Sequence, residues 1–127
     1  MTSVFDTSAV LAVIFEEPGG ENMPALWASG ECLMSTVNYA ELVAKLNERG
    51  LSDAEVVTVL EGVPLTLVAF DQATAHASGL LRTATKALGL SLGDRACIAL
   101  AKARRAVVVT ADRQWEKLAG IQVELIR

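Results

Sequence analysis

Five short apolar segments, separated by helix-forming stretches, constrain the fold of this chain more than any other feature. The segments lie at residues 3–5, 32–35, 65–70, 106–110 and 121–126. Between them, amphipathic stretches begin at capping residues and end near glycines, as helices do. This alternation predicts an α/β domain of three layers, in which helices flank a mostly parallel β-sheet.

Capping residues mark several of the expected helices. Ser52 and Glu55 have the spacing of a capping box, Asp71 precedes an alanine-rich helix that ends at Gly89, and Thr36 is placed to cap another helix. Residues 106–110 are almost entirely apolar, which is typical of a strand that is buried on both faces.

Length and composition indicate a single folded domain over residues 1–127. Of the 127 residues, 52% are hydrophobic and only 20% are charged, unlike a disordered chain. The longest apolar run, residues 9–15, is far shorter than the roughly 20 residues of a membrane span. No basic segment precedes it, as one would in a secretory signal. We therefore expect a cytoplasmic protein without a membrane span.

The cysteines and the charge exclude further classes. Cys32 and Cys97 have no second cysteine or histidine at metal-binding spacing, which predicts reduced core residues. Residues 1–70 carry ten acidic and two basic side chains, whereas residues 71–127 carry five acidic and nine basic ones. The net charge of −4 argues against a strongly basic nucleic-acid binder but leaves room for a local anionic ligand.

Four acidic residues lie close to predicted strand or helix boundaries. Asp6 ends the first strand, and Asp112 follows the fourth by two residues. Glu41 lies one turn into the helix after the second strand, and Asp94 opens a later helix. Ligands of open parallel sheets bind beyond the carboxyl ends of the strands. Carboxylates gathered there can hold Mg²⁺ or Mn²⁺ for phosphodiester hydrolysis.

Each acid also has a structural interpretation. Asp6, Asp94 and Asp112 could cap helices. Glu41 fits that interpretation less well, because apolar residues surround it in the sequence.

Three other polar residues are further candidates for a role in the site. Ser8 and Thr110, each two residues from an acid, either support a carboxylate or a metal-bound water or are plain turn hydroxyls. His76 stands alone in its helix, which argues against a nucleophilic triad.

Four segments, taken in order, resemble the PIN-domain nucleases. They are residues 6–12 (DTSAVLA), 35–41 (STVNYAE), 90–101 (LSLGDRACIALA) and 109–115 (VTADRQW). Any one of these segments is weakly specific, but four in sequence are strongly specific. The similarity covers the whole chain, and within the family it is greatest to the VapC toxins of bacterial toxin–antitoxin pairs.

The resemblance implies a divalent-metal-dependent endoribonuclease that acts on structured cellular RNA. The family's metal-binding acids correspond here to Asp6, Glu41, Asp94 and Asp112, with Thr110 in support. The implied cofactor is Mg²⁺ or Mn²⁺. The implied partners are a second copy in a homodimer and a VapB-like antitoxin whose tail occupies the active-site groove. Some relatives carry a further acid one turn after the third, where this chain has Cys97 and Ile98.

Electrostatics and the resemblance point to the same ligand. Two carboxylates about 5 Å apart repel by roughly 3 kcal/mol at an effective dielectric constant near 20, so four clustered acids predict a bound cation. Arg95 and Arg113 each follow one of these acids directly. Either could meet an RNA phosphate or be a solvated helix charge.

Three competing classes fit the sequence less well. A phosphoacceptor receiver domain needs paired acids after the first strand, where Asp6 stands alone, and a reactive aspartate after the third, where Asp71 begins a helix. A haloacid-dehalogenase-like phosphatase needs an acid at the position of Ser8. The third class is a catalytically silent PIN domain that only binds RNA or protein. The four intact carboxylates argue against it.

Overall fold

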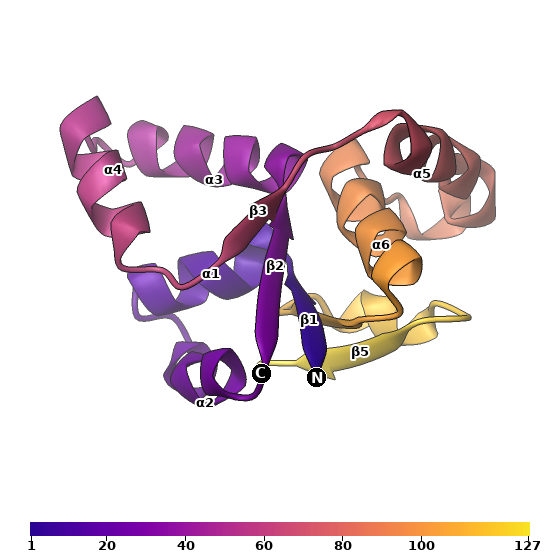
Figure 1. The fold of residues 1–127 in the computed structure, drawn as a ribbon, viewed down its shortest axis with the longest axis horizontal. Helices are drawn as coiled ribbons and strands as arrows, with labels where there is room; N and C mark the ends of the chain where they lie inside the picture. Colours follow the sequence, from indigo (N-terminus) through magenta and orange to yellow (C-terminus); the bar gives the residue numbers. More distant parts are fainter.

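A computed structural model describes all 127 residues as one five-stranded sheet with helices on both faces (Figure 1). The strand order is β3-β2-β1-β4-β5, and every neighbouring pair is parallel. The strands are β1 (Thr2–Phe5), β2 (Glu31–Ser35), β3 (Thr66–Val68), β4 (Val107–Thr110) and β5 (Gln122–Leu125). The predicted three-layer α/β fold is confirmed, and its sheet is parallel throughout.

Six α-helices and three short 3₁₀ helices connect the strands. The α-helices are α1 (Thr7–Ile14), α2 (Met23–Ala28), α3 (Thr36–Glu48), α4 (Asp53–Glu61), α5 (Gln72–Ala84) and α6 (Leu92–Arg104). The 3₁₀ helices are η1 (Gly20–Asn22), η2 (Lys86–Leu88) and η3 (Arg113–Lys117). In Figure 1, α1, α3 and α4 lie on one side of the sheet, and α5 and α6 lie on the other.

Successive strand residues supply two separate cores, because side chains alternate between the faces of a sheet. Phe5 and Val109 pack with α1 and α3 on one face. Val4 and Val108 pack with α6 and the fully buried Trp115 on the other face. The central strands are therefore covered on both sides, as the apolar sequence of β4 predicted.

The helix boundaries confirm some predicted caps and correct others. The capping box of Ser52 and Glu55 and the Asp71 cap are both present. Ser35, not Thr36, caps α3, since its side chain accepts from the Val37 amide. The helix after Asp71 is shorter than predicted, because α5 ends at Ala84 and η2 covers the residues before Gly89.

Two further expectations concern the cysteines and membranes. Cys32 and Cys97 are both free and buried, as predicted. None of the helices has the length and hydropathy that crossing a membrane requires.

Candidate active site

Asp6 occupies the position between β1 and α1 at the carboxyl edge of the sheet, and its side chain is only 6% exposed. Although it is the N-cap residue of α1, its carboxylate makes no capping hydrogen bond. Instead, Oδ2 accepts hydrogen bonds from Ser8 Oγ at 2.7 Å and from Thr110 Oγ1 at 2.9 Å. The capping interpretation of this side chain is therefore wrong.

The two hydroxyls that hold Asp6 are themselves anchored by the backbone. The Ala111 amide donates to Ser8 Oγ, and the Asp112 amide donates to Thr110 Oγ1, both at 3.0 Å. Because each hydroxyl accepts from an amide, its own proton is directed to Asp6 Oδ2. The other oxygen of Asp6, Oδ1, accepts no hydrogen bond within the protein.

Burial raises the pKa of Asp6 from 3.8 to about 6. The hydrogen bonds from Ser8 and Thr110 oppose this rise, and the negative charges of Asp94 and Glu41 add to it. Asp94 and Glu41 are therefore both close enough to Asp6 to repel its negative charge. Such repulsion at a buried carboxylate is typical of a site that holds a cation.

Glu41 is held on one oxygen by donors from α1 and α3. Thr7 Oγ1 donates to Glu41 Oε1 at 3.1 Å, and Asn38 Nδ2 donates to the same oxygen at 3.0 Å. The carboxylate lies directly against Gly93 in the first turn of α6, where a Cβ atom would collide with it. Oε2 accepts no hydrogen bond within the protein.

Asp94 has both a structural role and a place in the site. It is the third residue of α6 and forms a capping box, in which the Ser91 amide donates to Asp94 Oδ2 at 2.9 Å. Asp94 is therefore not the N-cap residue of α6, which is Ser91, but one of its oxygens takes part in the cap. Its charge nevertheless contributes to the raised pKa of Asp6.

Asp112 lies at the margin of the site and is exposed to solvent. Its Oδ1 accepts from the Gln114 amide at 3.0 Å, so the side chain caps η3. Its backbone connects it to the site, because its amide donates to Thr110 Oγ1. The structure therefore brings Asp6, Glu41 and Asp94 together and places Asp112 at their edge.

The chemistry of these groups fits a hard divalent cation. All the candidate metal ligands are carboxylate oxygens, which Mg²⁺ and Mn²⁺ prefer. No arginine or lysine neutralises them, since the one ion pair of the chain joins Arg127 to Glu17 at 4.0 Å. No three acidic, histidine or cysteine side chains lie close enough together in this structure to ligate one ion.

Cys97, in α6 with Asp94, is fully buried. Burial raises the pKa of this thiol well above its usual value, and the charges of Asp6, Asp94 and Glu41 raise it further. The side chain is therefore a neutral thiol. An additional acid at this position would be repelled by the negative charges of the same three acids.

The two predicted phosphate-binding arginines have different surroundings. Arg95 Nη1 donates to the Ser78 carbonyl oxygen of α5 at 3.1 Å, and Arg95 Nε is buried without a partner. Arg113 is exposed at the start of η3. In this structure Arg95 connects two helices, whereas Arg113 is accessible to a ligand.

Sequence reasoning missed three residues that hold the site: Thr7, Asn38 and Gly93. One available signal was position, because Thr7 adjoins Asp6 and Asn38 precedes Glu41 by one helical turn, on the same face of α3. Nothing in the sequence pointed to Gly93, whose role depends on contact between α3 and α6.

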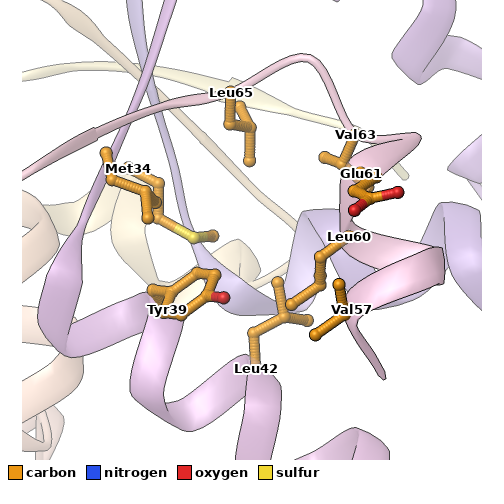
Figure 2. A pocket seen from close by; sticks show the side chains of 9 residues that line it. Met34, Tyr39, Leu42, Val57, Leu60, Glu61, Val63 and Leu65 are labelled. Carbon is orange, nitrogen blue, oxygen red and sulfur yellow. The ribbon is translucent and has the colours of Figure 1, made fainter. Parts of the chain in front are cut away.

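An apolar groove of about 240 Å³ lies apart from the acids, between α3, α4 and β3. Figure 2 shows Met34, Tyr39, Leu42 and Leu60 turned toward the same space. Glu61 is the one charged residue in its lining. None of the four acids lines this groove, so its chemistry differs from that of the site at the strand ends.

Together, the fold and the site define a class: a small three-layer α/β domain whose acidic side chains collect where parallel strands end. The chain belongs to the PIN domain family, whose sequence model matches residues 3–121. The sequence matches none of the curated proteins.

Solved structures share this fold over nearly the whole chain. A chain of the VapBC2 structure from Rickettsia felis, bound to a DNA fragment from its promoter, has a TM-score of 0.78, with 20% sequence identity over 98% of each chain. A chain of DNA-bound VapBC from Salmonella typhimurium has a TM-score of 0.77, with 22% identity over 100% of this chain and 99% of that one. VapBC-1 from nontypeable Haemophilus influenzae gives a TM-score of 0.76 at 17% identity, covering 99% of this chain and 98% of that one.

Proposed function

We propose that residues 1–127 form a single PIN-like nuclease domain that hydrolyses phosphodiester bonds in structured cellular RNA. The observation that carries this proposal is the buried Asp6 carboxylate. It lies beside Glu41 and Asp94, and no basic side chain of the chain forms an ion pair with any of them. Such a group favours a bound cation, and a cation at this edge of the sheet is suited to a phosphodiester substrate.

In this proposal, some of the residues bind the metal and others hold a metal-binding carboxylate in place. Asp6, Glu41 and Asp94 would hold Mg²⁺ or Mn²⁺, with Asp112 completing the set from the edge. Ser8 and Thr110 keep the Asp6 carboxylate in place through its Oδ2 atom. When bound, the cation would activate water and stabilise negative charge on the phosphate.

The proposed biological role is that of the toxin in a bacterial toxin–antitoxin pair. Support comes from the fold, which chains of the VapBC complexes from Rickettsia felis and Salmonella typhimurium share. The proposed partner is a VapB-like antitoxin. Its tail would place an arginine among the acids, which lack a basic partner of their own.

A homodimer is also proposed, because it follows from the family resemblance. Equilibrium sedimentation of the purified chain across a range of concentrations measures this directly. A single species of 13.4 kDa at every concentration would contradict it.

Cleavage of a labelled structured RNA by the purified protein tests the nuclease proposal. We expect cleavage with Mg²⁺ or Mn²⁺, and none with EDTA or with Asp6→Asn. Asp71→Asn is the matched control, because Asp71 is an exposed cap of α5 that accepts from the Thr74 amide. Asparagine caps helices as well as aspartate does, so this variant should cut as the wild type does.

Two results would contradict the proposal in different ways. Cleavage that persists both in EDTA and in Asp6→Asn would exclude metal chemistry at this site. RNA binding without any cleavage, at all divalent-ion concentrations, would favour the catalytically silent binding module. Sequencing the 5′ ends of RNA fragments after brief expression in cells identifies the substrate.

A further inference from the structure

We propose that Asn38 is a positioning residue that sets the place of the Glu41 carboxylate, and that Gly93 preserves the space this carboxylate occupies. The proposal rests on the proposed function, since it concerns the same metal site.

Asn38 uses both protons of its side-chain amide on the site. It is fully buried, and its Nδ2 donates to Glu41 Oε1 and to the Gly93 carbonyl oxygen, each at 3.0 Å. The first acceptor is on α3 and the second is in the first turn of α6. One amide therefore fixes the distance between the helix that carries Glu41 and the helix that carries Asp94.

The remaining atom of the amide shows that packing alone does not explain an asparagine here. Asn38 Oδ1 is buried and accepts no hydrogen bond. A buried acceptor without a partner lowers stability, so an apolar residue of the same shape would suit a purely structural position better. The two donated hydrogen bonds are what asparagine adds.

Thr7 reinforces the same arrangement from α1. Its hydroxyl lies 3.1 Å from both Glu41 Oε1 and the Asn38 carbonyl oxygen. The donors from Thr7 and Asn38 thus converge on one oxygen of Glu41 and leave Oε2 without a partner in the protein. Groups that orient a metal-binding carboxylate in this way commonly set metal affinity.

Gly93 is required by space and not by backbone conformation. Its φ angle is not in the left-handed region, so any residue could adopt its backbone. The nearest atoms to a Cβ at this position belong to the Glu41 carboxylate, which occupies that space. A larger residue at position 93 would push Glu41 away from α6 and from Asp94.

Asn38→Leu tests the inference, because leucine has nearly the shape of asparagine but donates no hydrogen bond. The readout is the Mn²⁺ concentration that gives half of the maximal rise in melting temperature. We expect this concentration to increase by roughly 10-fold to 100-fold. We also expect RNA cleavage to recover at saturating Mn²⁺, since the ligands themselves are intact. A half-maximal concentration within about twofold of the wild type would overturn the proposal.

Gly93→Ala provides a second test that leaves Asn38 in place. Alanine favours a helix more than glycine does. A change in helix propensity should therefore not lower the melting temperature of Gly93→Ala in EDTA. Mn²⁺ binding should nevertheless weaken. In a Glu41→Ala background the carboxylate is gone, and Gly93→Ala should then have no further effect on Mn²⁺ binding. An equal effect in both backgrounds would refute the role of Gly93.

Thr85→Val is the matched control for loss of a buried hydrogen bond. Thr85 is buried at the end of α5, and its hydroxyl donates to the Leu81 carbonyl oxygen at 2.7 Å. Its loss should lower the melting temperature without changing the half-maximal Mn²⁺ concentration. If the wild type shows neither Mn²⁺ stabilisation nor cleavage, the proposed function itself fails. If the wild type responds and both site variants respond equally well, only the positioning role is wrong.

Discussion

The hydroxyl groups of Ser8 and Thr110 lie 3.3 Å apart and hold the same oxygen of Asp6. Ser8 belongs to the first turn of α1, and Thr110 is the last residue of β4. The carboxylate is thus held by groups from two elements before any cation arrives. A site whose metal-binding carboxylate is already oriented loses less conformational entropy when the cation binds.

The raised pKa of Asp6 predicts how stability depends on pH. The folded value of about 6 exceeds the ordinary value of 3.8, so the folded state binds the proton more tightly than the unfolded state. The stabilisation by this proton is complete below pH 3.8 and is lost as the pH rises through 6. The free energy of unfolding of the wild type, minus that of Asp6→Asn, should therefore increase by on the order of 3 kcal/mol when the pH is lowered from 7 to 4.

Urea unfolding of both proteins in EDTA measures this difference. Comparison with Asp6→Asn removes the pH dependence that the other acids contribute to both proteins. A difference that stays constant across this pH range would show that Asp6 titrates normally.

Thr110→Val should weaken the support of Asp6. Thr110 is fully buried, donates to Asp6 and accepts from the Asp112 amide. Loss of these bonds should reduce the free energy of unfolding by about 1–3 kcal/mol. It should also raise the pKa of Asp6 further, because the bond from Thr110 lowers that pKa. The control is Thr58→Val, in which an exposed hydroxyl bond to the Ala54 carbonyl oxygen is lost. Equal effects of the two substitutions would contradict a special role for Thr110.

Asp112→Asn separates capping from metal binding at the margin of the site. Asparagine can still accept from the Gln114 amide, so stability in EDTA should be close to that of the wild type. Mn²⁺ at a hundredfold excess over its dissociation constant should stabilise the wild type by about 2.7 kcal/mol. The variant should gain less, as judged by melting temperature. A variant that is much less stable in EDTA, yet responds fully to Mn²⁺, would make Asp112 a cap alone.

Substitution of Arg113 tests whether this exposed side chain contacts RNA. Arg113→Gln should weaken RNA binding and reduce the slope of log affinity against log salt by about 1. Arg95→Gln should instead lower the melting temperature, because Arg95 joins α6 to the Ser78 carbonyl oxygen of α5. An unchanged salt slope in Arg113→Gln would identify its charge as solvated.

The toxin proposal predicts a neighbouring gene that encodes a small protein able to co-purify with this chain. Expression of the chain alone should slow growth, and co-expression of the neighbour should restore it. Asp6→Asn should not slow growth, because it lacks the buried carboxylate. A chain that cuts RNA but has no effect on growth would be a nuclease and not a toxin.

Much of the fold could be predicted because its signals are local. Runs such as residues 106–110 are apolar enough to form buried strands whatever surrounds them, and the Ser52–Glu55 capping box depends on neighbours in sequence. Asp6 and Asp112 could be chosen as candidate site residues because ligands bind where parallel strands end. The contribution of each side chain to metal binding stays a prediction.

Other features depend on contacts that no local pattern encodes. The bond from Asn38 to the Gly93 carbonyl oxygen joins residues 55 positions apart, and the space at Gly93 exists only because Glu41 fills it. The 3₁₀ helix of residues 113–117 also depends on tertiary contacts. Its Trp115 anchor is set by packing against the sheet.

The bond between Thr110 and Asp6 spans 104 positions of the chain. A ribosome adds roughly 5–20 residues per second, so Asp6 would be synthesised seconds before the strand that holds it. During that interval the site is incomplete, and a proposed toxin could not cut RNA near the ribosome that is making it.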